Sequence, residues 1–312
     1  MSFFPANDPI AGDKFSCDAL ELMIVPRSVD LGAAEVRRAL PHSTRRTVGP
    51  FVFFDHFGPA VFKSGNGLDV RPHPHIGLST LTYLYDGEII HRDTLGVQAA
   101  IHPGEVNWMT AGRGIVHSER TAPERRVDGE PLHGLQLWIA MPAKDEEIDP
   151  SFAHLDGEEL PVVEGEGKKA RVIAGRMFGA VSPLKTNSET ICADISLDAG
   201  AAMPLDADYE ERAIYVSSGE IDIAGDRFEM GRLLVFRPGD RITVTAVKPS
   251  RIAVVGGAPL DGPRYVWWNF VSSRRERIEQ AKEDWKRGWF GKVPGDEIEF
   301  IPLPEKPQTI AP

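Results

Sequence analysis

The chain has 312 residues, of which 42% are hydrophobic and 26% charged, a composition typical of a globular protein with more than one hydrophobic core. Its 35 basic and 46 acidic residues give a net charge of −11, which argues against non-specific binding to nucleic acids or anionic membranes. Two cysteines, Cys17 and Cys192, are too few for a disulfide framework, and no apolar run approaches the roughly 20 residues of a membrane span. We therefore expect a cytoplasmic protein of two domains.

The first sixty residues give mixed signals. Leu20 to Val25 is a candidate strand, and Leu31 to Leu40 fits either a strand or a helical turn. Val48 to Pro59 is a dense aromatic run whose phenylalanines are explained by core packing. Asp55 and His56 within this run are candidates to support a nearby site.

Regular alternation of apolar and polar residues begins at Leu78 and continues to Tyr85, where Asp86-Gly87 turns the chain. An Asp-Gly pair between alternating runs is a strong hairpin signal, so we expect Glu88 to Thr94 to return as the partner strand. Further short strands are predicted after turns rich in Gly and Pro: Gly104 to Trp108, Ile115 to Glu119 and Leu135 to Met141. Short strands at this spacing, without a helical period, indicate an antiparallel barrel or sandwich.

Two pairs of potential metal ligands lie in this region. His73 and His75 are two residues apart, and His117 and Glu119 repeat that spacing, so each pair leaves one face of an extended strand. Two strands facing each other across a small barrel would offer three imidazoles and one carboxylate to a common centre, a set that suits a divalent transition metal. Four protein ligands in an octahedral shell would leave two positions open. That arrangement suits oxygen activation better than a closed structural zinc site does.

The acidic stretch 143–168 has little apolar periodicity and is the predicted linker between domains 1–142 and 169–271. The second domain repeats the first, because Tyr215-Val-Ser-Ser-Gly-Glu-Ile221 echoes Tyr83-Leu-Tyr-Asp-Gly-Glu-Ile89. Aligning the repeats puts apolar residues where the ligands of the first domain stand: Leu205 and Ala207 for His73 and His75, and Val244 and Ala246 for His117 and Glu119. We therefore expect the second domain to lack metal ligands.

Residues 272–312 are predicted to form a helix and an extended tail. Ser273-Arg-Arg-Glu276 is a capping-box pattern, and Gly288 is the predicted stop. Ile278, Ala281 and Trp285 share one face of such a helix, so we expect this face to pack against a barrel.

Three long motifs are Arg71-Pro-His-Pro-His-Ile-Gly77, Trp108-Met-Thr-Ala-Gly-Arg-Gly-Ile-Val-His-Ser-Glu119 and His133-Gly-Leu-Gln-Leu-Trp138. Together they closely resemble the pirin family of bicupins, and Phe53-Phe-Asp-His-Phe57 and Trp267-Trp-Asn-Phe-Val-Ser272 fit its bacterial members. The resemblance covers nearly the whole chain. It implies an all-β protein of two antiparallel cupin β-barrels of jelly-roll type, followed by a C-terminal α-helix.

In that family the N-terminal cupin holds one iron through three histidines and a glutamate, and the match assigns these roles to His73, His75, His117 and Glu119. Many metal-binding cupins take their glutamate a few residues after the first histidine pair. Here that place is occupied by Leu78, Ser79 or Thr80, so the resemblance implies that Glu119 supplies the carboxylate. Fe(II) is the expected metal, although imidazole also tolerates Mn, Ni, Cu and Zn.

The resemblance also implies quercetin 2,3-dioxygenase activity, in which O2 opens a flavonol ring and carbon monoxide is released. The expected partners are then O2 and a small aromatic, flavonol-like substrate, bound by a monomer, with His117 and Glu119 as catalytic residues. Five residues are candidates for the wall of the substrate pocket: Trp108, Met109, Arg113, Gln136 and Trp138. Core packing explains the apolar ones equally well, and Arg113 is either an exposed charge or a gate at the pocket mouth. Three unpaired histidines are expected to form hydrogen bonds rather than bind metal: His91, His102 and His133.

Two other functions remain open. Relatives of pirin are described as transcription co-regulators and as partners of metabolic enzymes, so an iron-binding regulator that contacts another protein is the main alternative. The absence of a basic patch argues against direct contact with DNA. A zinc sugar isomerase would need a phosphate-binding cluster of Lys and Arg near the ligands, and the sequence has none around His73 or His117.

Overall fold

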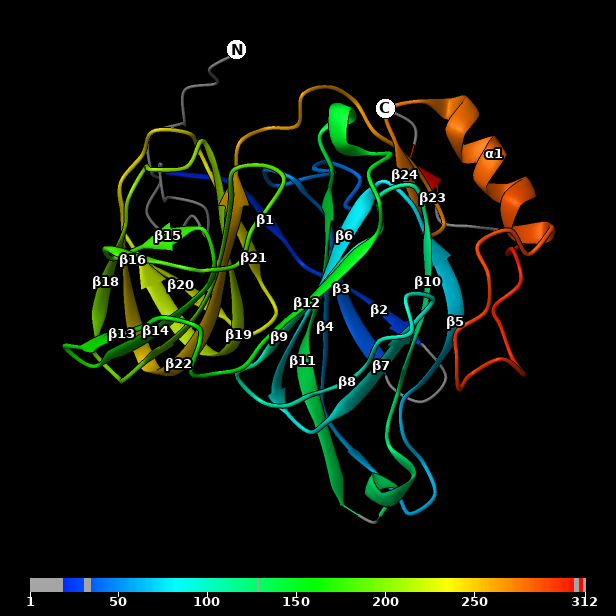
Figure 1. The fold of residues 1–312 in the computed structure, drawn as a ribbon. Helices are drawn as coiled ribbons and strands as arrows, with labels where there is room; N and C mark the ends of the chain where they lie inside the picture. Colours follow the sequence, from blue (N-terminus) through cyan, green and yellow to red (C-terminus); the bar gives the residue numbers. More distant parts are fainter. Residues whose placement is uncertain (1–18, 31–34, 128, 306–308, 311–312) are drawn as a thin grey trace. The chain divides into compact units, whose positions relative to one another are not determined.

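The computed structural model describes residues 19–30, 35–127, 129–305 and 309–310. The chain forms two compact units (Figure 1). The first cupin contains the described residues of 28–41, 51–159 and 260–312, and the second contains those of 1–27, 42–50 and 160–259. Each unit is therefore assembled from separate stretches of the chain. Cys17 lies outside the described residues, and Cys192 is a buried free thiol.

The first cupin contains two main antiparallel sheets. The larger sheet has the strand order β12-β9-β6-β11-β4-β3-β2. Its strands are β2 (Arg27–Asp30), β3 (Glu35–Leu40), β4 (Phe51–Phe62), β6 (Leu78–Asp86), β9 (Val106–Thr110), β11 (Glu130–Ala140) and β12 (Ser151–Leu155). The smaller sheet, in the order β5-β10-β7-β8, contains β5 (Asp69–His75), β7 (Ile89–Asp93), β8 (Gln98–Ile101) and β10 (Ile115–Arg120). A small third sheet joins β23 (Tyr265–Trp267) to β24 (Phe270–Ser272) and β25 (Thr309–Ile310). Two 3-10 turns, η1 (Pro123–Arg125) and η2 (Ala143–Asp145), lie between strands.

Apolar side chains join the two main sheets of the first cupin. Phe57 and Leu132 from the larger sheet pack with Ile89 and Ile101 from the smaller one. β6 is buried at eight of its nine positions. In the described part of the chain the strands form a jelly-roll sandwich of open sheets rather than closed barrels. The predicted all-β fold with two cupin domains is confirmed.

The Asp86-Gly87 turn does not form the predicted hairpin. β6 pairs with β9 and β11, whereas β7 pairs with β8 and β10 in the other sheet. Gly87 adopts a φ of +88°, and a Cβ there would collide with the carbonyl oxygen of Pro131. The local sequence specifies a tight turn. It does not specify which sheet receives the next strand.

The second cupin is built on one sheet of nine strands, with β18 and β20 attached beside the path β1-β21-β19-β22-β17-β14-β13. Its strands are β1 (Leu20–Ile24), β13 (Val162–Gly165), β14 (Lys168–Ala174), β17 (Thr190–Leu197), β18 (Ala202–Leu205), β19 (Glu211–Ile223), β20 (Asp226–Glu229), β21 (Leu233–Phe236) and β22 (Ile242–Gly257). A short hairpin joins β15 (Arg176–Met177) to β16 (Ala180–Val181). The predicted linker stretch 143–168 contains β12 of the first cupin and β13 of the second.

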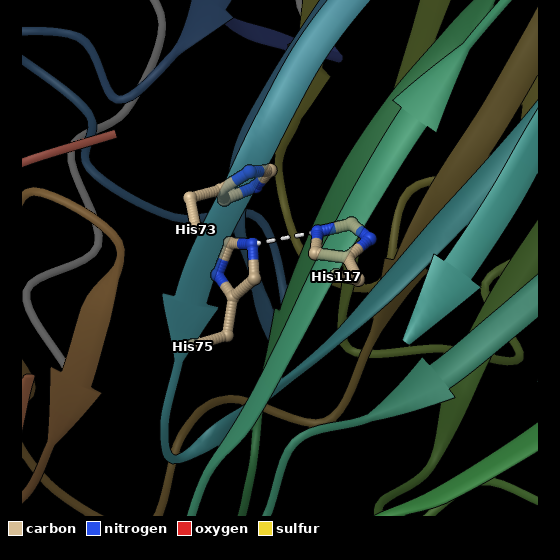
Figure 2. A group of neighbouring side chains, drawn as sticks. All are labelled: His73, His75 and His117. Carbon is tan, nitrogen blue, oxygen red and sulfur yellow. Dashed lines mark hydrogen bonds between the residues drawn. The ribbon is translucent and has the colours of Figure 1, made fainter. Parts of the chain in front are cut away.

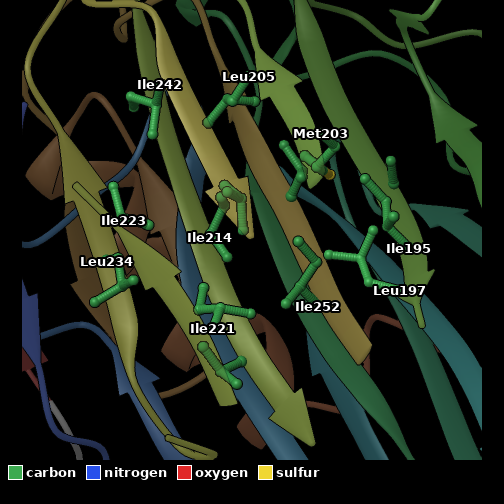
Figure 3. Close-up of a cluster of buried hydrophobic side chains, with 14 of the residues drawn as sticks. Ile195, Leu197, Met203, Leu205, Ile214, Ile221, Ile223, Leu234, Ile242 and Ile252 are labelled. Atoms are coloured by element: carbon green, nitrogen blue, oxygen red, sulfur yellow. The ribbon is translucent and has the colours of Figure 1, made fainter. Parts of the chain in front are cut away.

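Branched and long apolar side chains fill the interior of the second cupin (Figure 3). Leu205, Val244 and Ala246 are buried in this core. Ala207 lies beyond the end of β18 and is half-buried, while Met203 is the second inward-facing residue of that strand. Three of the four residues aligned with the predicted ligands are thus core residues, and Ala207 is not.

The C-terminal helix α1 (Arg275–Lys286) packs on the first cupin. Its N-cap is Arg274, so the capping box predicted at Ser273 is wrong. Ser273 instead donates its hydroxyl proton to Glu146 Oε2 at 3.0 Å and its backbone N–H to Glu146 Oε1 at 2.7 Å. Ile278 and Ala281 are buried, as predicted. Among the described residues, no helix is long and apolar enough to cross a membrane.

Candidate metal centre

Three histidines converge between the main sheets of the first cupin. His73 and His75 lie on β5, and His117 lies on the neighbouring strand β10, directly opposite His73. One ring nitrogen from each of the three lies within 4.8 Å of the other two. The Nε2 atoms of His75 and His117 are 3.1 Å apart (Figure 2). The two ligand strands are adjacent in one sheet, so the prediction that they face each other across a barrel is wrong.

Backbone carbonyls orient two of these rings. His73 Nδ1 lies 2.8 Å from the carbonyl oxygen of Arg71, and His75 Nδ1 lies 3.2 Å from that of Asn269. A carbonyl can only accept, so each Nδ1 is the protonated nitrogen and each Nε2 carries a lone pair. This is the tautomer that a metal ligand needs, held by the kind of supporting contact that metal-binding histidines usually have.

Burial keeps the three imidazoles neutral. It lowers the pKa of His73 from 6.5 to about 4, against the opposing effect of the hydrogen bond to Arg71. Burial and the neighbouring His73 lower the pKa values of His75 and His117 well below 6.5. At neutral pH the group therefore presents uncharged nitrogen donors, the form that binds a metal ion.

The donor set fits a divalent cation. His75 Nε2 carries a lone pair, so His117 must donate Nε2–H to it in the metal-free protein. The Nδ1 of His117 is then a buried acceptor, and it has no hydrogen-bond partner among the residues that the structure describes. A cation bound to the Nε2 lone pairs would remove the forced contact between the two Nε2 atoms, and His117 would then carry its proton on the buried Nδ1.

Glu119 lies beside this group and is not part of it. It follows His117 on β10, and the pairing with β5 shifts by a β-bulge between the two residues. Its carboxylate accepts a hydrogen bond of 3.0 Å from the Thr82 hydroxyl, and burial raises its pKa. Its role as the fourth ligand stays a prediction.

A cavity of about 370 Å³ adjoins the three histidines and Glu119. On one wall Phe53 and Trp138 are stacked, with ring centroids 4.0 Å apart and an interplanar angle of 12°. Trp138 also meets His75 edge to face, at a centroid distance of 5.1 Å. The guanidinium of Arg38 lies 4.3 Å from the Phe53 ring centre and forms two hydrogen bonds with Asp55. The cavity thus combines an aromatic wall with a few polar groups, as small-molecule sites do.

The structure brings some of the predicted pocket residues together and separates others. Gln136 and Trp138 line the cavity. The other three lie outside its lining. Trp108 is buried and donates its indole N–H to Thr110, Met109 packs in a separate apolar cluster, and Arg113 is an exposed partner of Asp149.

The three histidines without a paired ligand form hydrogen bonds, as expected. His91 Nε2 lies 2.9 Å from a carboxylate oxygen of Asp93, and His133 Nε2 lies 2.8 Å from His56 Nε2. His102 contacts two carboxylates, one on each ring nitrogen.

Sequence reasoning missed the part of the cavity wall that comes from the end of the chain. Trp268, Asn269, Ile301 and Pro304 all line the cavity. Trp268 has a φ of +54° in the turn between β23 and β24, a sparsely populated conformation for a residue other than glycine. The next residue, Asn269, supplies the carbonyl that orients His75. The motif Trp267 to Ser272 was the available signal, but nothing local in it points to a residue 194 positions earlier.

Comparison with known proteins places the chain in a family. The Pirin family model matches residues 33–139, and the Pirin C-terminal cupin domain matches residues 192–291. A pirin-like protein of Caulobacter vibrioides is 49% identical over 289 residues, which cover 92% of this chain and 100% of that protein. Human pirin is 32% identical over 281 residues, 87% of this chain and 93% of that protein. The crystal structure of a quercetin 2,3-dioxygenase from Acinetobacter baumannii matches with a TM-score of 0.84 and 32% identity, over 92% of this chain and 97% of that one. This chain belongs to the pirin family.

Proposed function

We propose that this protein is a metal-dependent dioxygenase of the quercetin 2,3-dioxygenase type, acting in the cytoplasm on flavonol-like substrates with O2. The observation that carries the proposal is the buried histidine group beside a cavity with an aromatic wall. The similarity to a quercetin 2,3-dioxygenase from Acinetobacter baumannii over almost the whole chain supports it.

In this proposal one Fe2+ is held by His73, His75, His117 and Glu119. Bound iron would supply Lewis acidity and a path for electrons between the substrate and O2. His73 and His75 already present Nε2 lone pairs at neutral pH, and His117 would move its proton from Nε2 to Nδ1 when a cation binds. All four of these residues line the cavity. Of the four, His117 and Glu119 are the proposed catalytic residues.

The cavity wall supplies substrate binding and orientation. The stacked rings of Phe53 and Trp138 give the cavity an apolar aromatic wall against which a flavonol ring can pack. Trp138 also contacts His75, so a ring bound against it would lie next to the histidine group. The volume of about 370 Å³ falls within the range of small-molecule sites, roughly 300–1,000 Å³.

The decisive experiment measures O2 uptake and carbon monoxide release by the iron(II)-loaded protein with quercetin. We expect coupled uptake and release in the loaded protein, and neither in the metal-free protein or in His117→Ala. Metal content is measured on the same samples, so that inactivity is separated from poor loading.

Absence of turnover at full iron occupancy would contradict the dioxygenase proposal. The alternative would then be an iron-binding regulator that acts on a protein partner without turnover. The regulator alternative is also based on the pirin family, of which human pirin, 32% identical to this chain, is a member.

A further inference from the structure

A single hydroxyl group links Glu119 to Gln136. Thr82 Oγ1 lies 3.0 Å from Glu119 Oε1 and 2.9 Å from the side-chain amide oxygen of Gln136. Thr82 on β6 is directly opposite Gln136 on β11 in the larger sheet, whereas Glu119 comes from β10 in the smaller sheet. Thr82 and Glu119 are both buried, with 3% and 8% exposure, so bulk water does not stand in for either contact.

The link contains one proton for two acceptors. A threonine hydroxyl donates one hydrogen bond, whereas an ionised carboxylate and an amide oxygen can only accept. If Thr82 donates to Glu119, Gln136 keeps its contact only by rotating its amide, so that Nε2–H donates to Thr82 Oγ1. The amide oxygen then turns away from Thr82 toward the cavity that Gln136 lines. If Thr82 donates to Gln136 instead, the amide NH2 faces the cavity and Glu119 loses its donor.

Binding of a cation decides between these two arrangements. A carboxylate that binds a metal ion is ionised and can only accept hydrogen bonds. A hydrogen bond to an ionised acceptor is roughly twice as strong as one between neutral groups. In the metal-loaded protein the Thr82 hydroxyl therefore donates its hydrogen bond to Glu119.

We propose that Thr82 is a positioning residue that holds the Glu119 carboxylate for metal binding and thereby turns the amide oxygen of Gln136 toward the cavity. The cavity then selects a flat aromatic ligand with a hydroxyl group that donates to Gln136 Oε1, beside the stacked rings of Phe53 and Trp138. This inference rests on the proposed metal centre with Glu119 as a ligand. It adds a reason for the site to prefer hydroxylated aromatic compounds over unsubstituted ones.

The first arm of the test measures Co2+ affinity and the visible spectrum of bound Co2+. Thr82→Val removes the hydroxyl and preserves the shape of the side chain, and we expect it to weaken Co2+ binding by about 10-fold or more. The spectrum should change with it, because the carboxylate ligand loses its orientation. Thr82→Ser keeps the hydroxyl and should restore both readouts. Wild-type affinity and spectrum in Thr82→Val would overturn the proposal.

The second arm measures binding of quercetin and of flavone, which has the same ring skeleton without hydroxyl groups, to cobalt-loaded protein under nitrogen. In Gln136→Leu the Thr82 hydroxyl can still donate its hydrogen bond to Glu119, so Co2+ affinity should stay close to that of the wild type. Its quercetin affinity should fall by roughly 2–10-fold, the value of one hydrogen bond, while flavone affinity should not change. Equal loss for both ligands, or no loss for quercetin, would contradict the proposed role of Gln136.

Neither arm depends on turnover, so the two proposals fail separately. If the wild-type protein is inactive but the Thr82 and Gln136 variants bind Co2+ and quercetin as expected, the dioxygenase proposal is wrong and the positioning role of Thr82 is supported. If the protein is active but Thr82→Val binds Co2+ like the wild type, the positioning role is wrong and the dioxygenase proposal is supported.

Discussion

The two cupins share a jelly-roll plan of strands and differ in what their inner faces carry. In the first, three buried histidines and Glu119 border a cavity, while in the second Leu205 and its neighbours form a continuous apolar core. A buried polar group needs a partner and a buried leucine does not, so the first cupin has to supply hydrogen bonds that the second can omit. Backbone pairing holds the strands in both units, which allows the same scaffold to carry either a polar site or simple packing.

The sharpest test of this contrast is removal of one ligand. His117→Ala should lose most of the bound iron, because it removes a lone-pair donor and leaves His75 without its neighbour. The loss of affinity should exceed the roughly 10–100-fold that removal of a supporting residue costs. Metal content is measured by mass spectrometry after loading with Fe2+ under nitrogen.

Leu205→Ala is the matched change in the second cupin. It should leave the iron content unchanged while lowering the free energy of unfolding by about 2–5 kcal/mol, since it opens a hole in a packed core. Loss of iron in Leu205→Ala would break the contrast between the two units.

Acid should weaken the first cupin more than the second. Burial, with His133 and Arg37 adding to it, lowers the pKa of His56 in the first cupin from 6.5 to about 3, and burial lowers that of His73 to about 4. Between pH 6.5 and about 4 these histidines become protonated in the unfolded chain but stay neutral in the folded chain. The free energy of unfolding of the metal-free protein therefore falls as pH falls, by up to about 1.4 kcal/mol per pH unit for each such histidine.

Hydrogen exchange at pH 7 and pH 5, corrected for intrinsic exchange rates, follows each unit separately. β5 and β10 should lose protection before β19 and β22 do. Earlier loss in the second cupin would contradict the assignment of the acid sensitivity to the buried histidines. His56→Gln should reduce the pH dependence, because it removes one of the groups responsible.

A smaller effect separates cavity wall from core within the first cupin. Trp138→Leu should weaken quercetin binding by about 0.5–1.5 kcal/mol, because it removes the ring stacked on Phe53. Trp108→Leu removes a buried indole outside the cavity lining and should leave quercetin affinity unchanged. Calorimetry on both variants decides the matter, and equal weakening would show that both indoles act through general packing.

The smallest effect is expected at Arg113. Its ion pair with Asp149 is exposed on both sides, so Arg113→Ala should change the free energy of unfolding by less than about 1 kcal/mol. Quercetin affinity and its rate of association should also be unchanged. A slower association in stopped-flow measurements would revive the prediction that Arg113 is a gate at the pocket mouth.

The sequence predicted what depends on short spacing and missed what depends on distant partners. Residues two apart on a strand share a face, so the pairing of His73 with His75 needed no tertiary information. The sheet that receives the chain after Gly87 is a tertiary choice, and a strong hairpin signal pointed to the wrong one. The turn at Trp268 and the carbonyl of Asn269 belong to the site only because the chain returns after another unit. Their place was visible only in the folded structure.

That return sets an order of events during synthesis. A ribosome delivers His75 long before Asn269, which lies 194 residues later, and Ile301 and Pro304 of the cavity wall emerge later still. Residues 160–259 of the second cupin are made in between. A metal ion arriving while the chain is growing would meet β5 and β10 without the carbonyl that orients His75. The cavity wall and the carbonyl that orients His75 are therefore complete only after the chain has been made as far as Pro304.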